Sequence, residues 1–205
     1  MSEEAGAGAE SQLFRIEQLP LPGMLSIQPT VHTDERGRLI KLFHEDAFRA
    51  LGLPRQFTEV FVSDSRERVV RGLHFQRPPS ACGKVVTCLA GAVFDVAVDL
   101  RHGSPTFGEH AIVTLNGESA TMLYLPPGLA HGFAVLGDHA LMAYLTTSQH
   151  NPELDDGVRW DSAGLPWPYR DPIVSERDRS LLPLSRLASP FTFDGTKGSQ
   201  GSHGA

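Results

Sequence analysis

Short apolar runs, separated by glycine and proline, occupy most of the chain. Within them apolar and polar residues alternate, which is typical of strands with one buried face. The predicted strands cover residues 38–43, 57–64, 69–76, 84–89, 92–100, 111–115, 120–125, 132–136 and 139–147. Ala90 and Gly91 are expected to form the turn of a hairpin between 84–89 and 92–100. Many short strands with little helix between them predict an all-β fold, either an antiparallel barrel or a two-sheet jelly roll.

Helical patterns are few and short. Residues 44–51 place Phe48 and Leu51 on one face, carry acidic residues in the first turn and are followed by Gly52. This pattern predicts a helix. A helical turn is expected at 175–181. From residue 151 onward the chain becomes irregular and rich in proline and tryptophan, so we expect this segment to form a strap across the barrel.

The domain organisation follows from length and from the ends of the chain. A chain of 205 residues suits one domain. We expect that domain to cover residues 11–190. Residues 1–10 and 191–205 carry little apolar periodicity, and we expect a disordered tail at the first and a flexible tail at the second.

Composition excludes several classes of protein. Lys and Arg number 18 against 24 Asp and Glu, a net charge of −6, which argues against a general nucleic-acid binder. No apolar run approaches the roughly 20 residues of a membrane helix, and the acidic, glycine-rich start does not resemble a signal peptide. Two cysteines, Cys82 and Cys88, do not make a disulfide framework. We therefore expect a cytoplasmic protein with neither a nucleic-acid nor a membrane partner.

Residues 126–131 have the form PxGxxH, which resembles a motif of cupin barrels. There a Pro-Gly turn directs a histidine, here His131, into the barrel mouth. Metal-binding cupins also carry His-x-His on an earlier strand, where this chain has His74-Phe75-Gln76. Alternation sends His74 and Gln76 to one face. One imidazole, one amide and a distant histidine make a poor site for a divalent metal, so we expect no metal and no cofactor.

Four basic side chains are expected at inward-facing positions: Arg71, His74, Lys84 and His131. A barrel interior with several cations favours an anionic ligand, and two phosphates of a nucleotide sugar would fit. The alternative is that these cations pair with Asp95 and Asp99, which lie four residues apart on a neighbouring strand.

Several ordered segments resemble the dTDP-4-dehydrorhamnose 3,5-epimerase family. They span roughly residues 27–184 and read DERG at 34–37, RGLHFQ at 71–76, CGK at 82–84, VFDVAVDLR at 93–101, GSPTFG at 103–108, PGLAHGF at 127–133 and SERD at 175–178, with Tyr144 and Thr146-Thr147. The resemblance implies a cupin-type double-stranded β-helix (jelly roll) with short peripheral helices. It also implies a metal-free homodimer that inverts C3, C5 or both in a nucleotide-linked 4-keto-6-deoxyhexose.

Such a reaction needs a base near neutral pKa, a group that stabilises the enolate oxygen, and an acid on the opposite face of the ring. By resemblance His74 is the base, and Asp178 holds its tautomer. Lys84 is the cation at the C4 oxygen, and Tyr144 is the acid. Without the family, the residues favour the interpretation of Tyr144 as a barrel aromatic with a hydrogen-bonded hydroxyl. The substrate-binding residues implied are Arg36, Arg71, Lys84, His131, Glu59, His150, Asp155 and Arg177.

The sequence departs from the family pattern where the nucleotide base and ribose would lie. Glu59 and Phe61 stand where many members have glutamine and asparagine, and Lys41 replaces a glutamate. His150 replaces an aromatic residue that stacks on thymine. We therefore expect dTDP as the carrier, with CDP and GDP open. Whether C3, C5 or both are inverted is also open.

Other functions compete with this hypothesis. A non-catalytic nucleotide-sugar-binding cupin would keep the arginines without an acid and a base on opposing faces. A keto-isomerase of the same fold would use a similar histidine, and a metal-dependent oxygenase would need the missing His-x-His. The apolar run at 13–25 is expected to be an arm that crosses between the subunits of the dimer and covers a sheet edge.

Overall fold

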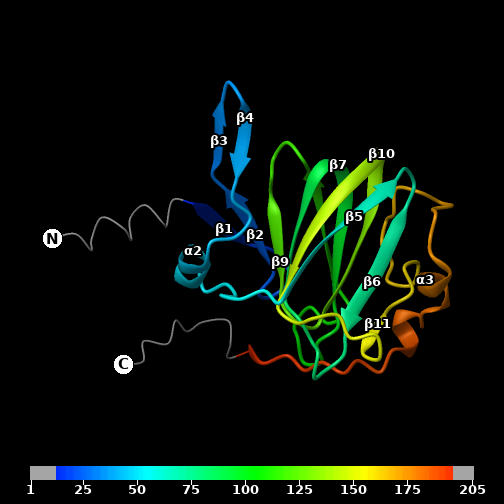
Figure 1. Cartoon of the computed structure of the whole chain (residues 1–205). Helices are drawn as coiled ribbons and strands as arrows, with labels where there is room; N and C mark the ends of the chain where they lie inside the picture. Colours follow the sequence, from blue (N-terminus) through cyan, green and yellow to red (C-terminus); the bar gives the residue numbers. More distant parts are fainter. Residues whose placement is uncertain (1–12, 196–205) are drawn as a thin grey trace, which may run out of the picture.

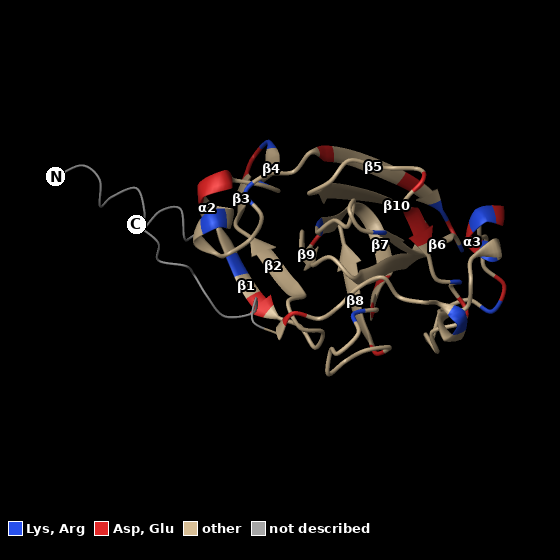
Figure 2. Cartoon of the chain, turned by 90° about the horizontal axis from the view of Figure 1, so that it is seen from below, with Lys and Arg blue, Asp and Glu red and all other residues tan. Residues whose placement is uncertain are grey.

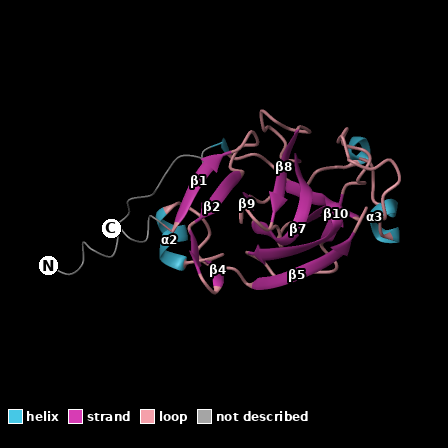
Figure 3. Cartoon of the chain, turned by 90° about the horizontal axis from the view of Figure 1, so that it is seen from above, coloured by secondary structure: helices cyan, strands magenta, loops and turns pink. Residues whose placement is uncertain are grey.

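The computed structural model describes residues 13–195 and shows a single β-barrel with two short helices on opposite sides (Figure 1, Figure 3). Within these residues the main sheet runs in the order β1-β2-β9-β7-β10-β6-β11, with β5 paired to β10 and β8 paired to β7. A separate hairpin, β3-β4, projects from the barrel (Figure 1). No helix among residues 13–195 is long and apolar enough to cross a membrane.

The elements have the following bounds: β1 Phe14–Gln18, β2 Leu25–Pro29, β3 Val31–Asp34, β4 Gly37–Ile40, α2 Glu45–Ala50, β5 Glu59–Arg66, β6 Val70–Gln76, β7 Lys84–Asp99, β8 His110–Asn116, β9 Met122–Leu125, β10 Leu129–Thr146, β11 Asp155–Gly157, α3 Glu176–Ser180 and the 3₁₀ turn Leu184–Arg186. The all-β prediction with short peripheral helices is confirmed.

The predicted hairpin between 84–89 and 92–100 is wrong, because both segments belong to one strand, β7. Gly91 (φ +75°) is a bend at which the β7–β10 register shifts, not a chain reversal. A Cβ on Gly91 would lie 2.0 Å from the His139 carbonyl oxygen, so the backbones approach too closely for a side chain. The predicted strands 132–136 and 139–147 are likewise one strand, β10. Such a bulge bends both strands together and curves the sheet into a barrel.

The bend gives β10 two sets of neighbours. Along its first half it pairs with β6, where His131 lies opposite His74, and along its second half it pairs with β5, where Tyr144 lies opposite Phe61. β7 follows β10 along both halves. Side chains from four strands therefore converge inside the barrel.

The predicted helix at 44–51 is confirmed as α2. The His44 side chain caps its first turn by accepting from the Ala47 amide. Phe48 is fully buried and meets Phe14 edge to face at 5.0 Å between ring centroids, a pair that contributes about 0.5–1.5 kcal/mol beyond its burial. The segment 13–25 forms β1 and the turn to β2 within its own chain.

The C-terminal segment folds back over the barrel as expected. β11 pairs with β6, and Ile173 forms a β-bridge with Val69. The helical turn predicted at 175–181 is present as α3. The expected tail at 191–205 begins too early, because Phe191 is buried against Phe75 at 5.3 Å and residue 192 bridges to residue 102. The expected tail at 1–10 and the remainder of the other tail lie outside the described residues.

Candidate active site

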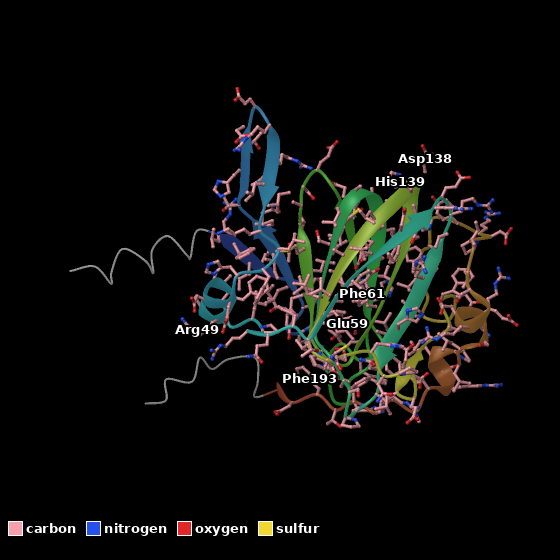
Figure 4. The ribbon with its side chains drawn as sticks, in the orientation of Figure 1. Arg49, Glu59, Phe61, Asp138, His139 and Phe193 are labelled. Carbon is pink, nitrogen blue, oxygen red and sulfur yellow. The ribbon has the colours of Figure 1, made fainter. Side chains whose placement is uncertain are left out.

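One cavity of about 230 Å³ opens between strands β5, β6, β7 and β10. Its lining contains both polar and aromatic side chains: Phe61, Ser63, Arg71, His74, Lys84, His131, Gly132, Phe133 and Tyr144. The structure thus brings together five of the residues singled out from the sequence. Figure 4 shows Glu59 and Phe61 on the β5 side of this region, whereas Asp138 and His139 lie away from it, at the bend in the middle of β10.

His74 and Asp178 form a hydrogen-bonded pair although 104 positions separate them. The His74 Nε2 atom lies 2.7 Å from Asp178 Oδ1. Asp178 lies in the first turn of α3, where its amide donates to the Ser175 hydroxyl. Its second oxygen accepts from the Gly72 amide at 3.2 Å. Because Asp178 occupies Nε2, the other imidazole nitrogen, Nδ1, remains for a reaction.

The environment keeps Asp178 ionised. Burial by itself raises the pKa of this carboxyl, but the hydrogen bond and charge of His74, the Gly72 amide and the charge of Arg177 together outweigh burial. The pKa of Asp178 therefore lies below its ordinary value. A charged, immobile carboxylate at Nε2 stabilises the imidazolium that forms when His74 accepts a proton.

Lys84 begins β7 and points into the cavity beside His74. Its ammonium donates to the His74 carbonyl oxygen at 3.4 Å, and among residues 13–195 the Asp155 carboxylate acts on it through its charge but forms no ion pair with it. Burial lowers the pKa of Lys84. A desolvated cation without a fixed counter-ion is suited to stabilise negative charge on a ligand oxygen.

Tyr144 lies on β10 and is almost fully buried, with 7% of its surface exposed. Burial raises the pKa of its phenol, which therefore stays protonated over the physiological range. The hydroxyl lies 3.2 Å from Ser63 Oγ, and the ring stacks on Phe61 at 4.6 Å between centroids. Tyr144 is thus both a hydrogen-bonded barrel aromatic and a protonated acid that lines the cavity.

The alternative that the cations pair with Asp95 and Asp99 holds for one of them. His131 Nε2 lies 2.9 Å from Asp95, and both side chains are buried. Burial raises the pKa of Asp95, and His131 opposes that rise. Asp99 instead accepts from Arg101 and from the hydroxyls of residues 104 and 106, outside the cavity.

A chain of polar contacts leads from β5 to the His74–Asp178 pair. The Glu59 carboxylate accepts from the His150 amide at 2.7 Å, and the His150 ring lies 3.3 Å from Asp155. Asp155 accepts a hydrogen bond from Arg177 at 2.7 Å. The Arg177 guanidinium also lies 3.4 Å from Asp178. The α3 region alternates basic and acidic residues accordingly (Figure 2). Four predicted binding residues are therefore contiguous with the pair.

Arg36 is not part of this assembly. It lies at the tip of the β3-β4 hairpin, its side chain is 85% exposed, and it pairs with Asp34. The hairpin stands apart from β5, β6, β7 and β10, the strands that line the cavity (Figure 1). Arg71 does reach the cavity, where its Nε donates to the Ser65 hydroxyl at 2.9 Å.

Sequence reasoning missed Ser63 and Phe133 as lining residues. Strand alternation carries the signal for Ser63, because it is two residues from Phe61 and shares its face.

The described residues contain no group of three or more His, Cys, Asp or Glu that could hold a metal ion. Gln76 turns from the cavity, since its amide contacts residues 80 and 149 and accepts from the Asn151 amide. A second hollow of about 380 Å³ lies beside α3, lined by residues 159–161, 170–172, 174 and 179. None of the predicted site residues lines it.

The cavity defines a class of protein. It gathers an imidazole backed by a carboxylate, an ammonium without an ion pair among the described residues and a protonated phenol, which are the groups needed to move protons beside a carbonyl group. A family model for dTDP-4-dehydrorhamnose 3,5-epimerase matches residues 18–186. The chain belongs to this family, and it is an isomerase of the epimerase type.

Individual relatives agree in sequence and in structure. A dTDP-4-dehydrorhamnose 3,5-epimerase from Methanothermobacter thermautotrophicus is 42% identical over 83% of this chain and 95% of its own length. A dTDP-4-dehydrorhamnose 3-epimerase from Streptomyces niveus is 37% identical over 84% of each. A dTDP-6-deoxy-D-glucose-3,5-epimerase from Legionella pneumophila, solved with dTDP-4-keto-L-rhamnose, superposes with a TM-score of 0.84 at 33% identity, covering 88% and 99% of the two chains. The cupin-type fold is confirmed.

Proposed function

We propose that this enzyme inverts C3, C5 or both of a nucleotide-linked 4-keto-6-deoxyhexose, with dTDP-4-keto-6-deoxyglucose as the expected substrate. His74 is the base and Tyr144 the acid. The observation that carries the proposal is the cavity that holds the carboxylate-backed imidazole together with a protonated phenol and a buried ammonium.

The reaction is a proton transfer through an enolate. The C3 and C5 hydrogens are acidic because the C4 ketone accepts the electron pair. His74 removes the proton, and Asp178 stabilises the resulting imidazolium. Lys84 stabilises the developing charge on the C4 oxygen. Tyr144 then protonates the same carbon from the opposite face, the ketone re-forms, and the stereocentre is inverted.

The size of the cavity indicates which part of the substrate it holds. Its volume of about 230 Å³ lies below the ~300–1,000 Å³ usual for complete ligand pockets, so it suits the hexose alone. The diphosphate would then lie at the exposed guanidiniums of Arg71 and Arg177, which bind phosphate bidentately. Glu59 and His150 lie beyond these two arginines and would face the nucleobase of the substrate. The dTDP carried by the Legionella complex favours dTDP here.

A homodimer is part of the proposal. Arg36 is exposed at the end of a projecting hairpin, so a contact with substrate requires the cavity of a second copy. β5 also has an apolar outer face, because Val60 and Val62 are 66% and 59% exposed. Analytical ultracentrifugation tests this directly, and a monomer at micromolar concentration would refute it. The cytoplasmic location expected from the sequence stays a prediction.

Incubation with dTDP-4-keto-6-deoxyglucose in D₂O, followed by mass spectrometry and proton NMR, tests the function. We expect deuterium at C3, C5 or both, no uptake with His74→Ala, and uptake without inversion with Tyr144→Phe. His139→Gln, at the exposed bend of β10 (Figure 4), is the matched histidine control and should behave as wild type. Binding without uptake for the dTDP, CDP and GDP sugars would instead establish a non-catalytic binding protein.

A further inference from the structure

Strand β5 holds the Tyr144 phenol at two points. Phe61 lies directly opposite Tyr144 in the β5–β10 ladder, and the two rings are almost parallel, with 10° between their planes. Ser63, two residues further along β5, places its hydroxyl 3.2 Å from the Tyr144 hydroxyl. Ladder register and alternation thus fix both the plane of the ring and the position of its oxygen.

Ser63 is available to donate to that oxygen. Its hydroxyl has no other hydrogen-bond partner within residues 13–195, and it is the one group in that span that hydrogen-bonds the Tyr144 hydroxyl. It is half-buried and lines the cavity. Phe61, in contrast, leaves 43% of its surface exposed, so packing in the core does not explain its position.

The proposed reaction creates a need for such a donor. When Tyr144 protonates the enolate carbon, its O–H bond breaks, a C–H bond forms and the electron pair stays on the phenolate oxygen. That oxygen is buried, and the nearby Asp95 carboxylate disfavours a second negative charge, whereas the Arg71 guanidinium favours it. The phenolate regains a proton from water, and the His74 imidazolium releases one to water, so protons balance over one turnover.

We propose that Ser63 is a positioning residue of this reaction: it donates to the Tyr144 phenolate as it forms, and Phe61 holds the ring in the plane in which that hydrogen bond is made. The inference rests on the proposed function and deepens it, because it assigns to β5 a role in inversion that proton removal by His74 does not require. His74 can remove a proton and return a deuteron to the same face without Tyr144.

The test separates these two events. Inversion and deuterium uptake with retention are measured together in D₂O for wild type, Ser63→Ala, Ser63→Thr and Thr114→Ala. Thr114→Ala is the control, because it removes an exposed hydroxyl from β8, a strand that does not line the cavity. A hydrogen bond to a charged group is expected to change the rate about 10- to 100-fold. Ser63→Ala should lose inversion by that factor, with KM and uptake with retention unchanged, and Ser63→Thr should restore inversion.

Phe61→Leu gives a second, independent reading. It removes the stacking partner but leaves the hydroxyl of Ser63 in place, so inversion should fall while uptake with retention persists. In Ser63→Ala, inversion at the wild-type rate would overturn the inference. So would an equal loss of inversion and uptake, or the failure of Ser63→Thr to restore inversion. A wild-type enzyme that shows neither event with the dTDP, CDP or GDP sugar overturns the proposed function itself, and this inference with it.

Discussion

Replacement of Asp178 by asparagine tests how the base is prepared. Asp178 accepts from Gly72 through one oxygen and lies 2.7 Å from His74 through the other. An asparagine in this position has only one acceptor. The Gly72 amide belongs to a backbone with no room to move, since a Cβ on Gly72 would lie 2.6 Å from Gly132 Cα. The asparagine oxygen is therefore expected to face Gly72, which turns its NH₂ group toward His74.

That orientation reverses the tautomer of His74. With an NH₂ donor at Nε2, the imidazole proton moves to Nδ1, the nitrogen that must be free to accept a proton from the sugar. Loss of a charge-assisted hydrogen bond alone costs about 1.5–3 kcal/mol, or roughly 10- to 150-fold. A wrong tautomer in a serine-protease triad costs about 10⁴-fold in kcat. We expect kcat of Asp178→Asn to fall about 10²- to 10⁴-fold.

The assay is deuterium uptake at C3 and C5 in D₂O, with circular dichroism to establish folding. Glu176→Gln is the matched control, because it makes the same chemical change at an exposed position of α3. The opposing influence is Arg177, which lies 3.4 Å from the oxygen that faces His74 but makes its shorter contact, at 2.7 Å, with Asp155. A folded Asp178→Asn enzyme with kcat within tenfold of wild type would refute the tautomer argument.

Three further outcomes are expected. Lys84→Gln should lower kcat about 10²- to 10³-fold, as the loss of an oxyanion-stabilising donor does, while calorimetry shows unchanged affinity for dTDP. The pKa of Asp178 lies below its ordinary 3.8, so its ionised form adds stability that is complete above pH 3.8 and is lost as pH falls through the lower folded-state pKa. The difference in Tm between wild type and Asp178→Asn should therefore shrink between pH 6 and pH 3. A constant difference in Tm would contradict the lowered pKa of Asp178. Gly91→Ala should cost more than about 1 kcal/mol in urea denaturation, and more than Gly137→Ala, whose φ is also positive but whose Cβ meets no atom within 4 Å.

Local pattern predicted the strands better than it predicted their connections. A glycine with positive φ between two apolar runs suits a hairpin turn and a bulge equally well. Gly91 lies at a bulge. The choice depends on β10, which runs beside both halves of β7 and bends with it. Since that partner lies some 50 residues away in the sequence, the residues around Gly91 do not contain the information.

The site residues likewise divide into those that local pattern placed in the cavity and those that it did not. Arg71 and His74 were expected to face one interior, but they lie three residues apart in β6, which strict alternation would place on opposite faces. Both reach the cavity because the β6–β10 register shifts between His131 and Phe133. Asp178 and Asp155 come from a segment without periodicity, and only the resemblance to a family indicated where they would lie. Ser63 was overlooked because a serine in a strand resembles any solvent-facing polar residue until its partner strand is known.

Burial differs between the positions expected to depart from the family pattern and the residues proposed to take part in proton transfer. Lys41 and His150 are exposed, and Glu59 lies half-buried at the end of β5. Substitutions at such positions usually change stability by less than about 0.5 kcal/mol. In contrast, Tyr144 and Asp178 are buried in contacts that their replacements would leave unsatisfied. The fold therefore tolerates change at the positions expected to face the nucleotide far more readily than at the two proposed to take part in proton transfer. A change of carrier is thus structurally easier for this barrel than a change of the proposed reaction.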